Sequence, residues 1–329
     1  MPQMPGMEHV SFSLHNSLTK WEWSPFPLVV LAVLILIAVW YLHADWVLAT
    51  RGRRWHSSRR ASFLLGLLAI DIGIQSPLAT YTMTYFQAHV LQHLMLMVVA
   101  PPLLALGAPS TLLLQTASRR TKERWLAVLR SQPFALISHP LTTWCLYFGV
   151  MFLFFLTSLV NTAMNDMALM DAINVVFLVG ATLYWWPMIG IDPIIHWKMG
   201  FGARMLNVLL GSAIEAFLGV AILAMSHPIA SMYSLSSTHS GGALLWVSTE
   251  FVTLAAFIPI FIQWIHSEAR AAARADIRSD RQELETAPSM ASGDGSPTRR
   301  LSAWEAAWYA KNGALPDVAR AKASEQPAT

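Results

Sequence analysis

The sequence contains one cysteine, Cys145, among 329 residues. A single cysteine excludes an intramolecular disulfide, a CxxC redox pair and a metal site built from several thiolates. Any metal chemistry in this chain must therefore rest on histidine, methionine and carboxylate side chains.

Charged residues are also scarce. Asp, Glu, Lys and Arg make up 12% of the chain, against roughly 25% of a typical soluble protein. Hydrophobic residues make up 55%, and the mean hydropathy is +0.45. The sequence also lacks a P-loop, a dinucleotide-binding fingerprint, a GxSxG elbow and an HExxH motif. These features predict a membrane protein that is not an enzyme and has no nucleic-acid partner.

Long apolar runs follow one another along the chain, and each approaches the ~20 residues that cross a bilayer as a helix. We therefore predict an all-α, multi-pass integral membrane protein with seven transmembrane helices, surrounded by membrane lipid. The predicted spans run from Pro27 to Val47, Ala61 to Thr80, Ala88 to Gly107, Leu141 to Val160, Ala168 to Met188, Ala203 to Met225 and Ala243 to Ile265.

The basic residues predict the orientation of these spans. Sixteen of them follow the first, third, fifth and seventh runs, whereas the opposite side carries only Lys20. The positive-inside rule then places the N-terminus outside and the C-terminus in the cytoplasm. We expect a periplasmic N-terminal lead over residues 1–26, a seven-helix domain over 27–266 and a cytoplasmic tail over 267–329, partly helical and then disordered.

The third run carries two histidines near its outer end. At 3.6 residues per turn, His89, His93 and Met97 lie on one face of a helix, at i, i+4 and i+8. Two imidazoles and a thioether form a ligand set for a soft metal ion, although buried histidines can also serve only as hydrogen-bonded packing residues. Pro101 and Pro102 are predicted to break or end this helix.

Further candidate ligands fall on the same predicted side of the membrane. His227 and His239 flank the sixth and seventh runs, and Met4, Met7 and His9 lie in the N-terminal lead. Imidazole and thioether together favour copper, Cu(I) above all, over Mg²⁺ or Ca²⁺. The alternative for each methionine is ordinary packing, since Met is a common gap-filler.

Polar side chains also interrupt the apolar runs. We expect at least one carboxylate to pair with His89 or His93, an arrangement that orients a ligating imidazole, and Glu250 is the favoured partner. The other polar groups could form a proton path or hydrogen bonds between helices. The residues proposed for these two roles are Asp71, Gln75, Gln92, Glu215 and Glu250. Small residues at four-residue steps near Glu215, from Asn207 to Gly219, predict close helix packing.

Three motifs in the sequence resemble those of a known membrane-protein family. They are HVLQHLMLMVVAPPLLALGAP at 89–109, LYWWPMIGIDP at 183–193 and GGALLW at 241–246. The chain resembles the polytopic CtaG-type cytochrome c oxidase assembly family over roughly Phe26 to His266. The residues that fall on the motifs are His89, Gln92, His93, Pro101, Pro102, Trp186, Pro187, Asp192 and Pro193. Where family members often show an Asp-Gln-Gln run before the last span, this chain has Ser237 to Ser240, with His239 between them.

The resemblance implies a bacterial inner-membrane protein that helps to mature a haem-copper oxidase by supporting copper delivery to the catalytic subunit. The partners would then be oxidase subunits, and the oligomeric state is open. Three alternatives stay open as well: a haem-binding module in which His227 or His239 supplies the second axial ligand, a copper or proton-coupled transporter that uses Asp71, Glu215 and Glu250 as a relay, and a metal-free scaffold for oxidase subunits.

Overall fold

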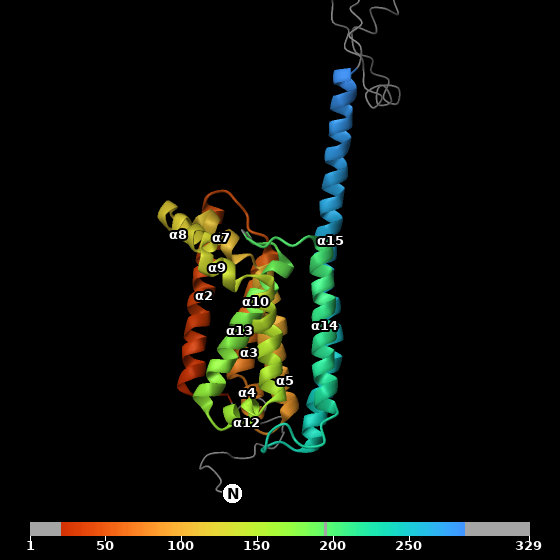
Figure 1. The fold of residues 1–329 in the computed structure, drawn as a ribbon. Coiled ribbons are helices and arrows are strands. Elements are labelled where there is room, and N and C mark those ends of the chain that lie inside the picture. Colours follow the sequence, from red (N-terminus) through yellow and green to blue (C-terminus); the bar gives the residue numbers. More distant parts are fainter. Residues whose placement is uncertain (1–20, 194–195, 287–329) are drawn as a thin grey trace, which may run out of the picture. The chain divides into compact units, whose positions relative to one another are not determined.

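The computed structural model describes residues 21–193 and 196–286. Within these ranges helices are the only regular secondary structure, and turns and loops connect them (Figure 1). The helices are α2 (Pro25–Thr50), α3 (Ser57–Gln75), α4 (Pro77–Tyr81), α5 (Phe86–Leu94), η1 (Met95–Val99), α6 (Ala100–Leu106), α7 (Pro109–Thr116), α8 (Arg119–Arg130), α9 (Gln132–Ile137), α10 (Pro140–Trp144), η2 (Cys145–Gly149), α11 (Val150–Leu156), α12 (Leu159–Met164), α13 (Met167–Ile189), α14 (Phe201–Leu223) and α15 (Leu235–Thr286).

Within the described ranges, six helical stretches are long and apolar enough to cross a membrane: Pro25–Thr50, Ser57–Tyr81, Phe86–Thr116, Met167–Ile189, Phe201–Leu223 and Leu235–Ser279. They confirm the prediction of an all-α, multi-pass membrane protein. The remaining predicted span corresponds to Pro140–Leu156, a shorter apolar helix built from α10, η2 and α11. The count of seven therefore stays a prediction.

Contacts divide the chain into two units, Met1–Ile262 and Gln263–Thr329. In the second unit the described residues form the last part of α15, whose residues from Glu268 to Ser279 are exposed to solvent. The candidate site lies wholly within the first unit.

The helix starts follow local sequence rules. Prolines occupy the first turn of α2, α7 and α10, where a backbone N–H would have no partner within the helix. The side chain of Asp166 accepts a hydrogen bond from the backbone N–H of Leu169 and caps α13. Ser118 caps α8 in the same way, through Thr121.

The buried apolar residues form two clusters. One joins α2, α3 and α6, and here the hydroxyl of Tyr41 donates to the backbone oxygen of Gly107 at 2.8 Å and accepts a hydrogen bond from Trp55 Nε1 at 2.8 Å. The other is rich in aromatic rings and joins α5, η1, η2, α11, α13, α14 and α15. The two histidines of the predicted stripe lie in this second cluster.

The helix that carries the histidines changes its hydrogen-bond pattern at the prolines. Because Pro101 has no N–H, it cannot bond to the carbonyl oxygen of Met97, four residues earlier. The π-helical segment η1 covers this region, and Trp185 Nε1 donates to that oxygen at 3.0 Å. The sequence predicts that the prolines break or end the helix. They accompany a break in its α-helical pattern but do not end it, since α6 continues to Leu106 and the chain turns only at Ala108, with a φ of 50°.

Helices α14 and α15 pack with their backbones close together. A Cβ atom added at Gly219 would lie 2.7 Å from the backbone nitrogen of Trp246 and 3.0 Å from the backbone oxygen of Gly242. One turn apart on the same face of α14, Asn207 accepts a hydrogen bond from Trp144 at 3.2 Å, and Gly211 lies against Phe148 and Tyr184. The stripe of small and polar residues on α14 is therefore a packing face, as predicted.

Candidate functional site

Two histidines one turn apart on α5 lie in direct contact. His89 is 1% exposed and His93 is 4% exposed, and their Nε2 atoms are 2.8 Å apart. Aromatic rings surround the pair. The centroid of the His93 ring lies 4.8 Å from the ring centroid of Phe177 and 5.4 Å from that of Phe155. The two imidazoles are therefore polar groups buried among aromatic side chains.

A tyrosine from the loop between α14 and α15 orients this pair. The hydroxyl of Tyr233 donates to the backbone oxygen of Thr82 at 2.6 Å and lies 3.2 Å from His89 Nδ1. Burial raises the pKa of the Tyr233 phenol, so the hydroxyl keeps its proton. The shorter hydrogen bond, to Thr82, takes this proton, and we therefore infer that His89 Nδ1 donates to the tyrosine oxygen.

These hydrogen bonds determine the tautomers of both rings. If His89 carries its proton on Nδ1, its Nε2 is an acceptor, and His93 Nε2 must donate to it. A neutral His93 then has no proton on Nδ1. This nitrogen is buried and has no hydrogen-bond partner among the described residues. The network therefore leaves one imidazole lone pair free inside the core.

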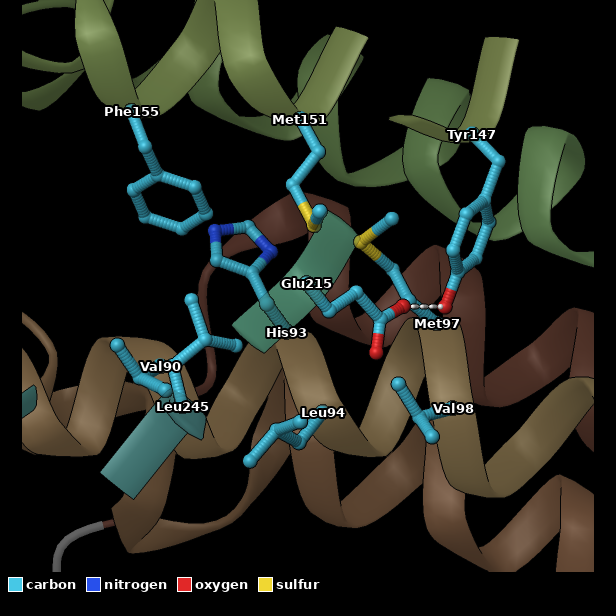
Figure 2. A pocket seen from close by; sticks show the side chains of 10 residues that line it. All are labelled: Val90, His93, Leu94, Met97, Val98, Tyr147, Met151, Phe155, Glu215 and Leu245. Carbon is cyan, nitrogen blue, oxygen red and sulfur yellow. Dashed lines mark hydrogen bonds between the residues drawn. The ribbon is translucent and has the colours of Figure 1, made fainter. Parts of the chain in front are cut away.

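A small cavity lies beside this lone pair. It has a volume of about 10 Å³, which is close to the room needed by one water molecule or one metal ion. Figure 2 shows the thioether groups of Met97 and Met151 pointing into it from different helices, toward one ring nitrogen of His93. The other lining residues are Val90, Leu94, Val98, Tyr147, Phe155, Glu215 and Leu245.

The acid at this cavity is Glu215. Tyr147 donates a hydrogen bond to its Oε1 at 2.7 Å, and only 7% of Glu215 is exposed. Glu250, the favoured carboxylate from the sequence, lies on the exposed side of α15. The reason is helical periodicity: Thr249 is buried, and the next residue points about 100° away from it. Glu250 therefore does not pair with the histidines.

The other predicted ligands lie elsewhere. His239 Nε2 is 2.9 Å from the backbone oxygen of Met225, and His227 Nδ1 is 3.2 Å from that of Pro228, so neither histidine lines the cavity. Met4, Met7 and His9 lie outside the described residues. Within the part of the chain that the structure describes, no three His, Cys, Asp or Glu side chains converge on one point. The further donors for a metal ion at the cavity are thioethers, those of Met97 and Met151.

The remaining polar candidates, Gln92, Gln75 and Asp71, do not line the cavity. Gln92 Nε2 donates to the backbone oxygen of Gly73 at 2.8 Å and so joins α5 to α3. Gln75 is buried, and its backbone oxygen accepts a hydrogen bond from Glu22 at 2.9 Å. Asp71 is half-buried on α3 and does not line the cavity.

The motif after α13 caps the start of α7. The carboxylate of Asp192 accepts hydrogen bonds from the backbone N–H of Ser110 at 3.1 Å and of Thr111 at 2.8 Å, and from the Thr111 hydroxyl at 2.6 Å. Burial raises the pKa of Asp192, and these hydrogen bonds oppose that shift. The neighbouring motif residues Trp186, Pro187 and Pro193 line a second cavity, of about 30 Å³.

Replacing Asp192 by Ala should destabilise the protein, because two backbone donors at the start of α7 lose their acceptor. Losing a cap of this kind costs about 0.5–2 kcal/mol. Thermal unfolding of the detergent-solubilised variant measures the effect. Asp192→Asn keeps an acceptor oxygen and should lose less; equal stability of Asp192→Ala and the wild type would contradict the capping role.

The profile of the cytochrome c oxidase caa3 assembly factor family (Caa3_CtaG) matches residues 39–267. The chain belongs to this family. The histidine pair and its cavity lie inside the matched region.

Three mycobacterial proteins are similar to this chain. An uncharacterized protein of Mycobacterium leprae is 26% identical over 280 residues, which cover 80% of this chain and 42% of that protein. Uncharacterized proteins of Mycobacterium bovis and Mycobacterium tuberculosis are each 26% identical over 298 residues, covering 85% of this chain and 43% of theirs. The chain thus spans less than half the length of these relatives. No solved structure matches it.

Four residues at the candidate site were not among the sequence candidates: Tyr147, Met151, Trp185 and Tyr233. The spacing of Tyr147 and Met151, four residues apart, was a usable signal, because it places both on one face of a helix. Tyr233 lies in a loop and Trp185 contacts a backbone oxygen. Neither position has a local pattern that predicts its contact.

Proposed function

We propose that this chain supports assembly of its oxidase by delivering copper to the catalytic subunit. In this proposal it is a bacterial inner-membrane protein with seven spans, its N-terminus and histidine pair face the periplasm, and it catalyses no covalent step. Copper is the cargo that it binds and passes on.

The observation that carries the proposal is the buried histidine pair beside a cavity with room for one ion. His93 and Met97 both line this cavity, and His89 contacts His93. Imidazole and thioether are ligands of copper, and the chain has a single cysteine, Cys145, which is exposed. Membership of an oxidase assembly family supports copper as the ion, because a haem-copper oxidase contains it.

The geometry favours this function over the haem and transporter alternatives. A haem needs far more space than a cavity of about 10 Å³, and neither His227 nor His239 lines it. A proton-coupled transporter would need a path of several acids, and of the three carboxylates proposed as a relay only Glu215 lines the cavity. A measurement of copper binding distinguishes copper delivery from the metal-free scaffold.

The test is the copper content of the detergent-purified protein under reducing conditions. The wild type should hold about one Cu(I) per chain, and the double variant His89→Ala, His93→Ala should hold none. The matched control is His227→Ala, His239→Ala, which removes the same number of imidazoles away from the cavity and should bind copper like the wild type. If the wild type binds no copper, the copper proposal fails and the chain acts as a metal-free scaffold for oxidase subunits.

A further inference from the structure

The free lone pair on His93 Nδ1 indicates where an ion would bind. Tyr233 holds the proton of His89 on Nδ1, and His89 in turn holds the proton of His93 on Nε2. The two Nε2 atoms therefore share one hydrogen bond with each other, and neither is available to an ion. A ligand nitrogen that is already deprotonated and desolvated is available only at Nδ1 of His93.

Two thioethers lie where this lone pair points. Met97 comes from η1 and Met151 from α11, and they are 2% and 4% exposed. Figure 2 shows both sulfur atoms on the side of the cavity that one ring nitrogen of His93 faces. Met97 lies within the π-helical segment Met95–Val99, and Met151 follows the π-helical segment Cys145–Gly149 by two residues. Such segments are rare and frequently occur at functional sites.

We propose that Nδ1 of His93 and the sulfur atoms of Met97 and Met151 form a three-coordinate site for a monovalent soft cation, Cu(I), with Ag(I) as its analogue. This inference rests on the proposed copper function and assigns its ligands. His89 and Tyr233 are positioning residues, since they fix the tautomer of His93 and do not bind the ion.

The donor set determines the selectivity of this site. Thioethers are soft, neutral ligands that favour Cu(I), whereas Zn²⁺ and Mg²⁺ prefer harder or charged ligands. Glu215 is the one carboxylate that lines the cavity, and it would balance the positive charge of a cation in the apolar core. Because the ligands include no thiolate, the ion is held less tightly than in a cysteine site and can be passed on.

Copper X-ray absorption and Cu(I) affinity of the full-length protein in detergent test this assignment. The wild-type spectrum should show sulfur neighbours together with nitrogen. Met151→Leu should reduce the sulfur scattering to that of Met97 alone and bind Cu(I) about 10–100-fold more weakly. The matched control is Met188→Leu, which changes a buried methionine that does not line the cavity and should leave both measurements unchanged.

The positioning role has a separate measurement. Tyr233→Phe removes the acceptor of the His89 proton and keeps the ring, so Cu(I) affinity should fall about tenfold while the sulfur signal persists. Glu215→Gln should likewise weaken binding and keep the sulfur signal.

The outcomes separate the ligand assignment from the function. If the wild type binds Cu(I) with nitrogen neighbours alone, or if Met151→Leu matches Met188→Leu, the thioether site is overturned and copper delivery stands. If the wild type binds neither Cu(I) nor Ag(I), both proposals fail. Retention of tight Ag(I) binding by the wild type and its loss in Met151→Leu supports the site even where copper is oxidised.

Discussion

Cells whose only copy of this chain carries His93→Ala are expected, from the proposed copper delivery, to make an oxidase that contains haem but little copper. The substitution removes the one buried imidazole with a free lone pair at the cavity. Oxidase activity and the copper-to-haem ratio of the purified oxidase should both fall about tenfold or more, since even the loss of a residue behind a ligand costs 10–100-fold in affinity. Haem content should stay near that of the wild type.

The control for this experiment is His239→Ala. That histidine contacts the backbone oxygen of Met225 and does not line the cavity, so the oxidase should keep its copper. Immunodetection of the variant chains in membranes confirms that both are present in equal amounts. A His93→Ala strain with a fully metallated oxidase would contradict copper delivery through this site, and the chain would then act as a scaffold.

The second large effect is expected at the crossing of α14 and α15. Gly219→Leu would force a side chain into backbone atoms, because even a Cβ atom there lies 2.7 Å from the nitrogen of Trp246. The helices must separate, and Glu215 and Leu245 line the cavity from these two helices. Overpacking lowers the free energy of unfolding by about 1–3 kcal/mol where side chains can adjust. We expect a loss at or above the upper end of this range, because the new side chain would clash with backbone atoms.

Thermal unfolding of the detergent-solubilised protein measures this effect, together with the yield of folded protein. Gly202→Leu is the matched control on the same helix, because a Cβ atom at Gly202 meets nothing within 4 Å. Equal unfolding temperatures for the two variants would show that the close approach of α14 and α15 does not stabilise the fold.

Local periodicity explains why the fold class and part of the site were predictable. A bilayer requires helices of ~20 apolar residues, so composition and run length alone predict a multi-pass helical protein. The contact between His89 and His93 also follows from local geometry, since residues four apart lie one above the other on a helix. Met97 still lines the cavity with His93, although η1 interrupts the α-helical pattern.

The choice between Glu250 and Glu215 shows where periodicity stops being sufficient. Both acids lie in apolar helices, and sequence cannot say which face of each helix turns inward. In the structure Glu215 is buried and bonded to Tyr147, whereas Glu250 is exposed. The outcome depends on how α14 and α15 pack, which is set by the close approach of Gly219 and Gly242.

The sequence by itself determined that this chain is an all-α membrane protein whose metal chemistry cannot use several cysteines, and it placed two histidines together on one helix. Only the tertiary structure decided which nitrogen is free and which sulfur atoms face it. Tyr233 and Met151 come from segments far from His93 in the chain, and packing brings them to it. Tautomers and ligand sets depend on such long-range contacts, because each proton is placed by a partner on another helix or loop.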